Sequence, residues 1–339
     1  MESKKEMNEK NKFFKDLENC TISLKPLLKI NKFKPINKQK FKSIIKVNNM
    51  SNDRDSKLFP DEDIQKNIHP KNKLNDLSGK EWIKFLKSWF IFDALPSDLK
   101  EEAKISTKLK QHPATFSPTM VSDFIKFFTK SGMTVLDPFC GIGSTLVACD
   151  RTGRLGYGIE LNKDFVKETS LRISHNQKII HADASKLDEI DLPPIDYCIT
   201  SPPYWNMLHK IDVNQKIRLD KKLLTKYSDD SNDLGNISDY NLFMEKLLMI
   251  FDKVYDKMRE GAYLTIIVQN IVNKDTMIPF AWDLALKLST PPHKFILKKE
   301  KIWCQNHKNL YPFGYPYAWV SNTHHHYCLI FRKEERKLL

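Results

Sequence analysis

The stretch Val135-Leu-Asp-Pro-Phe-Cys-Gly-Ile-Gly-Ser-Thr145 decides the fold that we expect for this chain. Its first residues form a short apolar run, as in a buried strand. Gly141 and Gly143 then allow a tight turn in which the backbone approaches a ligand closely. A helical pattern follows and is ended by Gly153. This order of strand, glycine loop and helix is typical of an open α/β sheet that binds ligands at the carboxyl ends of its strands.

The same alternation continues on both sides of this stretch. Strands are predicted at 134–139, 155–161, 178–184, 195–201, 261–270, 295–304 and 324–333. Helices are predicted at 78–92, within 112–132, and at 145–153, 163–176, 239–258 and 279–289. In the first of these helices, Ser78 is the expected cap, and apolar residues follow at helical spacing: Trp82, Phe85, Leu86 and Trp89. The pattern predicts βαβ units around a mostly parallel sheet, closed by an antiparallel hairpin.

Charge and polarity set one end of the chain apart. The net charge is +13, and residues 1–50 hold thirteen Lys against five Asp or Glu. We therefore expect residues 1–77 to form a basic, partly disordered arm, residues 78–333 one catalytic domain, and residues 334–339 a tail. The polar stretch 206–240 is too long for an ordinary connection, which predicts a functional loop. The charge indicates a polyanionic partner without separating DNA from RNA or an anionic surface.

Cysteine usage and hydropathy point to a reducing, aqueous compartment. Six cysteines are scattered without a CxxC pair, so neither a disulfide nor a zinc site is expected. No apolar run reaches the ~18 residues of a membrane span, and the charged first residues are unlike a signal peptide. These features predict a cytoplasmic protein that makes no membrane contact.

Three predicted strands end in carboxylates. Asp137 precedes the glycine loop, and Glu160 and Asp183 end the next two strands. One such residue alone would indicate a helix cap, whereas three in register with a glycine loop indicate a rim around a ligand. Asp137 would repel a phosphate and pair with an amino group. The loop also lacks the third glycine of GxGxxG and the GK[ST] of a phosphate loop, which disfavours dinucleotides and ATP.

The segment Thr200-Ser-Pro-Pro-Tyr-Trp205 ends another apolar strand and carries the most specific signal. Consecutive prolines fix φ and remove two N–H donors, so the chain is stiff and presents carbonyl oxygens. Ser201 Oγ and the Pro202 carbonyl can accept hydrogen bonds from an NH₂ group. Tyr204 offers a ring on which an extruded base can stack. The plainer interpretation, a proline turn with two core aromatics, is the less favoured one beside the glycine loop.

Together, DPFCGIGST and TSPPYW resemble the motif pair of the DNA amino-methyltransferases, which act on cytosine N4 or adenine N6. HPATFSP, residues 112–118, is similar to the family's cofactor-closing segment, GIELN to its ribose-binding strand and WVSNTHHHYCLIFRK to its last strand. The resemblance covers about residues 78–333. It implies a Rossmann-like class I fold, S-adenosylmethionine as cofactor and double-stranded DNA as partner. A cognate restriction endonuclease stays open as a second partner.

The resemblance also implies a role for each motif residue. Asp137 would hold the methionine amino group, Glu160 the ribose and Asp183 the adenine amino group. The rest of the cofactor would lie against Thr115, Phe139, Gly141, Gly143, Ser144 and Thr145. The target base would be held by Ser201, Pro202, Pro203 and Tyr204.

The implied reaction is direct methyl transfer to an exocyclic amine of a base flipped out of the duplex. It needs no cysteine nucleophile, although Cys140 and Cys198 flank the site. In the resembling family, serine at the first position of the tetrapeptide is commoner in cytosine enzymes. Ser201 therefore favours a site-specific cytosine-N4 enzyme, with adenine N6 as the alternative. Trp205 either narrows the base pocket or faces the core.

Two further alternatives stay open. The same acceptor segment would serve an exocyclic amine in RNA. A nucleic-acid-binding protein with a degenerate cofactor site is the non-enzymatic alternative, but it predicts loss of a rim carboxylate or of the tetrapeptide, and all are present. The run His324–His326 does not predict a metal site, because consecutive strand residues point to alternate faces. The candidates for reading the DNA sequence are residues 1–100, 206–240 and 303–323.

Overall fold

The computed structural model describes residues 68–92, 116–206, 233–273, 276–306 and 310–336. Most of the predicted arm, most of the loop 206–240 and the candidate residue Thr115 lie outside these ranges. Contacts divide the chain between Asp63 and Ile64, and every described residue belongs to the second unit. Within the described ranges, no helix has the length and apolar character needed to cross a membrane.

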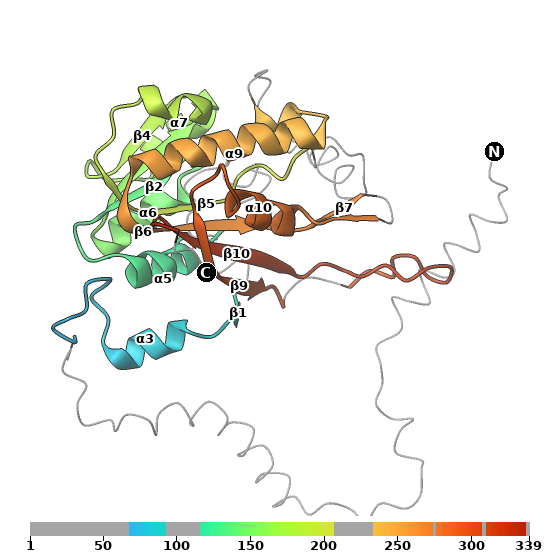
Figure 1. Ribbon diagram of the computed structural model, residues 1–339, viewed down its shortest axis with the longest axis horizontal. Coiled ribbons are helices and arrows are strands. Elements are labelled where there is room, and N and C mark those ends of the chain that lie inside the picture. Colours follow the sequence, from blue (N-terminus) through green and yellow to red (C-terminus); the bar gives the residue numbers. More distant parts are fainter. Residues whose placement is uncertain (1–67, 93–115, 207–232, 274–275, 307–309, 337–339) are drawn as a thin grey trace, which may run out of the picture. The chain divides into compact units, whose positions relative to one another are not determined.

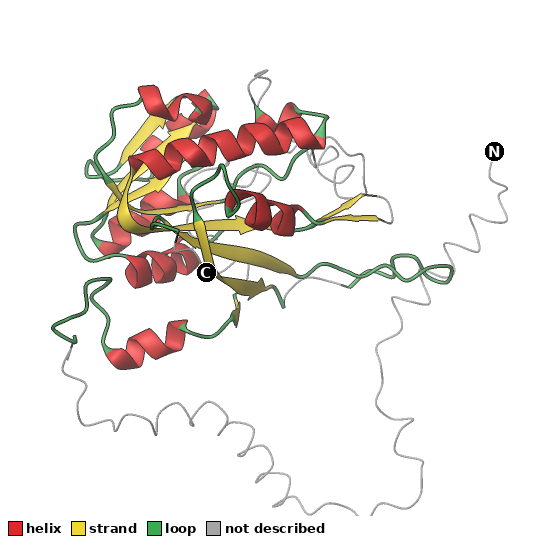
Figure 2. Cartoon of the chain, viewed as in Figure 1, coloured by secondary structure: helices red, strands yellow, loops and turns green. Residues whose placement is uncertain are grey.

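Eight strands form one sheet with helices packed on both of its faces (Figures 1 and 2). The helices are α3 (Gly79–Phe85), α5 (Pro118–Phe128), α6 (Ser144–Thr152), α7 (Lys163–Ser170), α9 (Tyr240–Lys257) and α10 (Phe280–Leu288). The strands of the sheet are β1 (Trp89–Ile91), β2 (Thr134–Asp137), β3 (Leu155–Glu160), β4 (Lys178–His181), β5 (Ile195–Thr200), β6 (Met258–Val268), β9 (Ile296–Cys304) and β10 (His325–Arg332). Two short 3₁₀ helices, η6 (Ala184–Glu189) and η8 (Leu234–Asn236), and a small hairpin of β7 (Ile271–Asn273) and β8 (Thr276–Ile278) complete the elements.

The strand order is β1-β9-β10-β6-β5-β2-β3-β4. Neighbours from β4 to β6 run parallel, while β10 is antiparallel to both β6 and β9. The predicted mostly parallel sheet with a closing antiparallel hairpin is therefore confirmed. The order reverses between β2 and β5, because the chain moves from β2 outward to β4 and then returns to β5 on the other side of β2. In open α/β sheets such a switch point leaves a ligand crevice at the carboxyl ends of the two strands.

Alternation of apolar residues along the central strands builds two cores, one on each face. Leu136, Cys198 and Ile266 point toward α9 and α10, and their cluster includes Phe243, Phe251 and Phe280. Their chain neighbours Val135, Tyr197 and Ile267 point toward α5 and α6. All four residues of β2 are buried, as expected of a central parallel strand covered on both sides.

The prediction for residues 78–92 was correct at the start and wrong at the end. Ser78 and Glu81 form a reciprocal capping box, but α3 ends at Phe85. Trp89 lies in β1 instead, half exposed, where it pairs in parallel with Ile302 of β9. Sheet pairing across more than two hundred positions of sequence overrides the local helical spacing.

Other differences are smaller. The helix predicted at 163–176 ends at Ser170, after which Ser174 N donates to Asp150 Oδ2 at 3.0 Å. Asn75 is fully buried, and its side chain donates a hydrogen bond to the Phe127 carbonyl at 2.6 Å. Residues that precede Ser78 in sequence therefore also pack against the folded domain. The domain boundary at Ser78 stays a prediction.

Candidate active site

The glycine loop lies at the carboxyl end of β2, beside the switch point. Gly141 and Gly143 have φ of 56° and 84°, values that residues with a Cβ rarely adopt. A Cβ on Gly143 would also collide with the Thr169 side chain, whose Oγ1 donates to the Gly141 carbonyl at 3.2 Å. The loop is thus the tight turn that the two glycines predicted, and it packs against α7.

Asp137 is buried beneath this loop, with 1% of its surface exposed. Its Oδ2 accepts from Thr145 Oγ1 at 2.6 Å, and its Oδ1 accepts from Thr200 Oγ1 at 2.6 Å and Phe139 N at 3.1 Å. Burial raises the pKa of Asp137 to about 6, against the lowering effect of these three hydrogen bonds. The carboxylate therefore connects the glycine loop to the end of β5.

Glu160 ends β3 and lies across from the loop. It accepts hydrogen bonds from Gly141 N at 2.8 Å and Asn162 N at 2.7 Å. Burial raises its pKa to about 7, and the nearby charges of Asp137 and Asp233 add to this effect. Glu160 therefore fixes the loop and places a half-buried carboxylate beside it.

The third predicted rim residue has a simpler place. Asp183 follows β4 and accepts from Ser185 N at 2.8 Å, so it caps η6. A capping role does not exclude ligand contact, because the second carboxylate oxygen has further acceptor capacity. Its role toward the adenine stays a prediction.

The remaining predicted cofactor residues that the structure describes gather around the same loop. Ser144 and Thr145 are buried in the first turn of α6. Phe139 packs against the core, with its ring 6.3 Å from that of Phe251. Thr115 is outside the described residues, so the structure does not place it.

The proline segment begins where β5 ends. Ser201 Oγ and Tyr204 Oη lie 3.2 Å apart, and Tyr204 Oη donates to the Ile267 carbonyl at 3.3 Å. When Tyr204 donates to Ile267, its oxygen accepts the Ser201 hydroxyl, which keeps the lone pairs of Ser201 Oγ as acceptors. The geometry is therefore compatible with the predicted recognition of an NH₂ group by Ser201.

Aromatic neighbours define the surroundings of this segment. The Tyr204 ring lies 6.1 Å from Phe280 and 6.3 Å from His326. Trp205 has a φ of 52° and meets the Tyr240 ring edge-on at 5.5 Å. Of the two alternatives for Trp205, the structure therefore favours packing against α9 and the core.

The cysteines and histidines near the site have structural roles. Burial raises the pKa of the Cys140 and Cys198 thiols well above their ordinary value, so both stay protonated and are poor nucleophiles. His326 stacks on Trp303 at 4.7 Å, while His325 meets Tyr327 at 5.2 Å.

Two residues of this site, Thr200 and Asp233, were not among the predicted site residues. Thr200 was interpreted only as the first residue of the proline segment, yet its hydroxyl donates a hydrogen bond to Asp137. Asp233 is buried at the start of η8, where it accepts from Gly235 N at 2.8 Å and its charge acts on Glu160. An acidic residue immediately before Leu-Gly-Asn at the end of a long polar stretch was the available signal for this second carboxylate.

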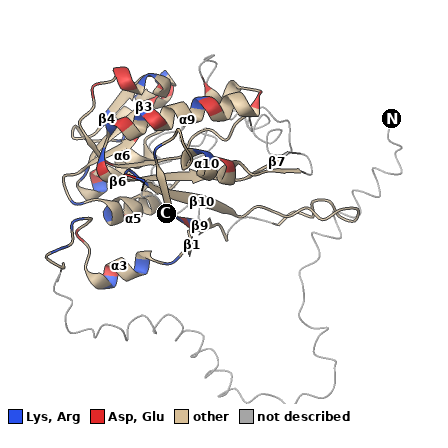
Figure 3. Ribbon diagram, viewed as in Figure 1, with Lys and Arg blue, Asp and Glu red and all other residues tan. Residues whose placement is uncertain are grey.

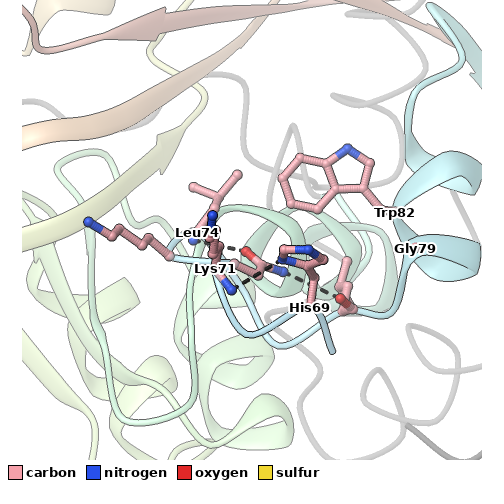
Figure 4. A pocket seen from close by; sticks show the side chains of 8 residues that line it. His69, Lys71, Leu74, Gly79 and Trp82 are labelled. Carbon is pink, nitrogen blue, oxygen red and sulfur yellow. Dashed lines mark hydrogen bonds between the residues drawn. The ribbon is translucent and has the colours of Figure 1, made fainter. Parts of the chain in front are cut away.

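S-adenosylmethionine fits the chemistry of these groups. Two carboxylates with raised pKa values face a glycine loop, and among the described residues their hydrogen-bond donors are hydroxyls and backbone amides. Such a site disfavours phosphate and suits a ligand with an ammonium, a sulfonium and ribose hydroxyls. A hollow of about 410 Å³ elsewhere is lined by residues from His69 to Trp82 and shares no residue with this site (Figure 4).

Comparisons with known proteins agree with this chemistry. A family model described as DNA methylase, for N6 and N4 enzymes, matches residues 3–171. The type II methyltransferase M.ScaI of Streptomyces caespitosus is 31% identical over 78 residues, which are 21% of this chain and 26% of that protein. M.MjaI of Methanocaldococcus jannaschii, also a type II methyltransferase, is 26% identical over 113 residues, or 31% of this chain and 36% of that protein.

The chain thus matches between about a quarter and a third of the length of these curated relatives. Among solved structures, a TehB-like SAM-dependent methyltransferase from Corynebacterium glutamicum is 12% identical with a TM-score of 0.38. The alignment covers 70% of this chain and 99% of that one.

Proposed function

The chain belongs to the DNA amino-methyltransferase family, and on this premise we propose that it transfers a methyl group from S-adenosylmethionine to cytosine N4 in double-stranded DNA. The observation that carries the proposal is the pair of hydrogen bonds on Asp137. Through Thr145 and Thr200, each at 2.6 Å, this one carboxylate joins the glycine loop to the segment that begins at Ser201. A cofactor site and a base site held together at the switch point are what methyl transfer between two bound molecules requires.

The residues that would hold the cofactor are those around the glycine loop. Glu160 would accept hydrogen bonds from the ribose hydroxyls, and Asp183 one from the adenine amino group. Asp137 would favour the positive charge of the methionine amino group, and the positive φ of Gly141 and Gly143 gives the loop beside it its tight turn. When bound, S-adenosylmethionine supplies an electrophilic methyl group.

The residues that would hold the base are those of the proline segment. Ser201 Oγ and the Pro202 carbonyl would accept the two N–H groups of the amine, which orients its lone pair toward the methyl carbon. Tyr204 would stack on the extruded base. Unstacking costs a few kcal/mol, which this stacking and phosphate contacts from Lys and Arg would offset.

The choice of cytosine over adenine rests on Ser201. Both amines are conjugated with their rings, so a neutral hydroxyl is a sufficient acceptor for either. The serine itself is the family signature that favours cytosine. A base pocket narrowed by Trp205 does not support the choice of cytosine, because the Trp205 ring packs against Tyr240. Adenine N6 is therefore the alternative outcome of the test. A cognate restriction endonuclease remains a proposed partner.

Transfer of radiolabelled methyl from S-adenosylmethionine tests the proposal. The purified chain is incubated separately with unmethylated duplex DNA and with total RNA, and the label in each polymer is counted. We expect label in duplex DNA. Label in RNA alone, or in neither polymer while the cofactor binds, would contradict the proposal.

A further inference from the structure

A loop between β9 and β10 exposes a set of large apolar side chains. We call residues 310–322 the aromatic loop, and Figure 1 shows it extending beyond the ends of the two strands. Its exposed apolar residues are Leu310, Tyr311, Phe313, Tyr315, Tyr317 and Trp319. Tyr317 and Trp319 are 95% and 90% exposed, and so large a set of neighbouring exposed apolar side chains is uncommon on a protein surface. A surface of this kind indicates a binding partner.

The loop is held in shape by its own hydrogen bonds. Asn322 Nδ2 donates to the Tyr311 carbonyl at 2.7 Å, and Tyr311 N donates to Asn322 Oδ1 at 2.9 Å, so one side chain closes the base of the loop. Gly314 has a φ of 76°, and its carbonyl accepts from Tyr317 N and Ala318 N, each at 2.7 Å. The rings are therefore presented on an ordered turn, which lowers the entropy lost on binding.

Strand register places this loop at the active-site edge of the sheet. Thr200 pairs with Ile266 of β6, Val268 of β6 pairs with Tyr327 of β10, and His325 pairs with Cys304 of β9. The loop thus leaves the sheet at the edge where Ser201 and the glycine loop lie. Near the strand ends from which the loop leaves, the His326 ring stacks on Trp303 of β9 and lies 6.3 Å from the Tyr204 ring.

Charge distinguishes the kind of partner. The sequence holds no Asp or Glu between residues 305 and 331, but it has Lys308 and four histidines there. In Figure 3 the ribbon of the described part of the loop is tan throughout, which means that it contains no Lys, Arg, Asp or Glu. A polyanion is therefore not repelled from this surface. Exposed aromatic side chains are the groups on which unstacked nucleic-acid bases stack in many proteins.

We propose that the aromatic loop grips duplex DNA beside the flipped base, with Tyr317 and Trp319 packing against bases that the extrusion leaves unstacked. This inference rests on the proposed function, because base extrusion creates the exposed faces that the rings would cover. It selects residues 310–322 from the three regions that the sequence left as candidates for DNA contact.

The test compares DNA binding of the full chain and of single variants in the loop. The probe is unmethylated duplex DNA, and the dissociation constant is measured by fluorescence anisotropy at several salt concentrations with S-adenosylmethionine present. We expect Tyr317→Ala and Trp319→Ala each to weaken binding about tenfold. The slope of log affinity against log salt should not change, because stacking releases no counterions. Trp89→Ala, a half-exposed aromatic outside the loop, is the matched control and should bind as the wild type does.

Each outcome supports or overturns the inference. Unchanged binding by Tyr317→Ala and Trp319→Ala would overturn it, as would a loss that reduces only the salt slope. The inference would also be overturned if sedimentation showed that the wild type is a dimer and the variants are monomers, with unchanged DNA affinity. The loop would then bind a second copy of the chain. The proposed function is tested separately, by methyl transfer. If the wild type transfers no methyl group, the proposed function fails, whatever DNA affinity the loop variants have.

Discussion

Asp137 Oδ1 and Thr200 Oγ1 form a 2.6 Å hydrogen bond between two strands that are more than sixty positions apart in sequence. The bond lies where the strand order reverses, and both residues are buried. A single carboxylate therefore sets the spacing between the glycine loop on one strand and Ser201 on the next. A displacement of either strand end would be transmitted to both halves of the site.

Thr200→Val tests the strength of this connection. The substitution preserves side-chain shape and removes one hydroxyl donor to a buried carboxylate, for which we expect a loss of about 1.5 to 3 kcal/mol in the free energy of unfolding. Urea denaturation measures it. Thr265→Val is the matched control, because Thr265 is equally buried and its hydroxyl oxygen accepts a 2.8 Å hydrogen bond from the neutral Tyr197 hydroxyl. An equal cost for both variants would show that the carboxylate bond has no special weight.

The raised pKa of Glu160 predicts a pH dependence of stability. Burial raises this pKa from 4.5 to about 7, so the folded state binds the proton more tightly than the unfolded chain. Its contribution to stability is therefore present below about pH 4.5 and is lost as the pH rises through about 7. Asp137 shifts in the same direction, to about 6.

Glu160→Gln isolates this effect. The stability of the variant relative to the wild type should rise between pH 5 and pH 8 by an amount on the order of 2 kcal/mol, because glutamine does not ionise. Urea denaturation at the two pH values, without cofactor, gives the difference. A relative stability that stays constant with pH would show that Glu160 ionises normally in the fold.

Much of this site could be predicted from the sequence because its signals are local. Glycines 141 and 143 have the positive φ that their motif requires, and the capping box of Ser78 forms as its spacing indicates. The strand and helix periods identified the sheet and its closing hairpin. The sequence also brought Asp137, Glu160 and Ser201 to one edge, because parallel strands end at the same side.

The parts that could not be predicted depend on long-range pairing. Trp89 follows a helical spacing, but β9 supplies a strand partner that no local pattern reveals. Asp137 was predicted only as a carboxylate of the ligand rim, whereas it is also buried with three hydrogen bonds. Thr200 and Asp233 were missed for the same reason, since their importance lies in a carboxylate on another strand.

The basic arm carries a prediction that rests on sequence alone. Deleting residues 1–50, with their thirteen lysines, should weaken DNA binding and flatten its salt dependence, since each lost phosphate contact lowers the log–log slope by about 0.9. Transfer activity should survive at low salt. A full-length variant with these lysines changed to glutamine separates the effect of charge from the effect of chain length. If log affinity against log salt has the same slope for this variant as for the wild type, the arm does not contact phosphate.

Ser201→Ala tests the acceptor role in the base site. The variant should reduce kcat by about tenfold or more, because one orienting hydrogen bond to the amine is lost, while cofactor affinity in calorimetry stays the same. Tyr204→Phe is the companion variant, since it keeps the stacking ring and removes the hydroxyl that contacts Ser201 and Ile267. It should retain more activity than Ser201→Ala. A fall in cofactor affinity with unchanged kcat would move Ser201 into the cofactor site instead.

The most direct measurement is the identity of the methylated nucleoside. Duplex DNA is incubated with the purified chain and S-adenosylmethionine, digested to nucleosides and analysed by mass spectrometry. We expect N4-methylcytosine, because Ser201 is the first residue of the tetrapeptide that would hold the amine. N6-methyladenine would overturn the choice of base and leave the exocyclic-amine chemistry standing. A methyl group on cytosine C5, or none on DNA, would contradict the central claim that Ser201–Tyr204 presents a base amine for methylation.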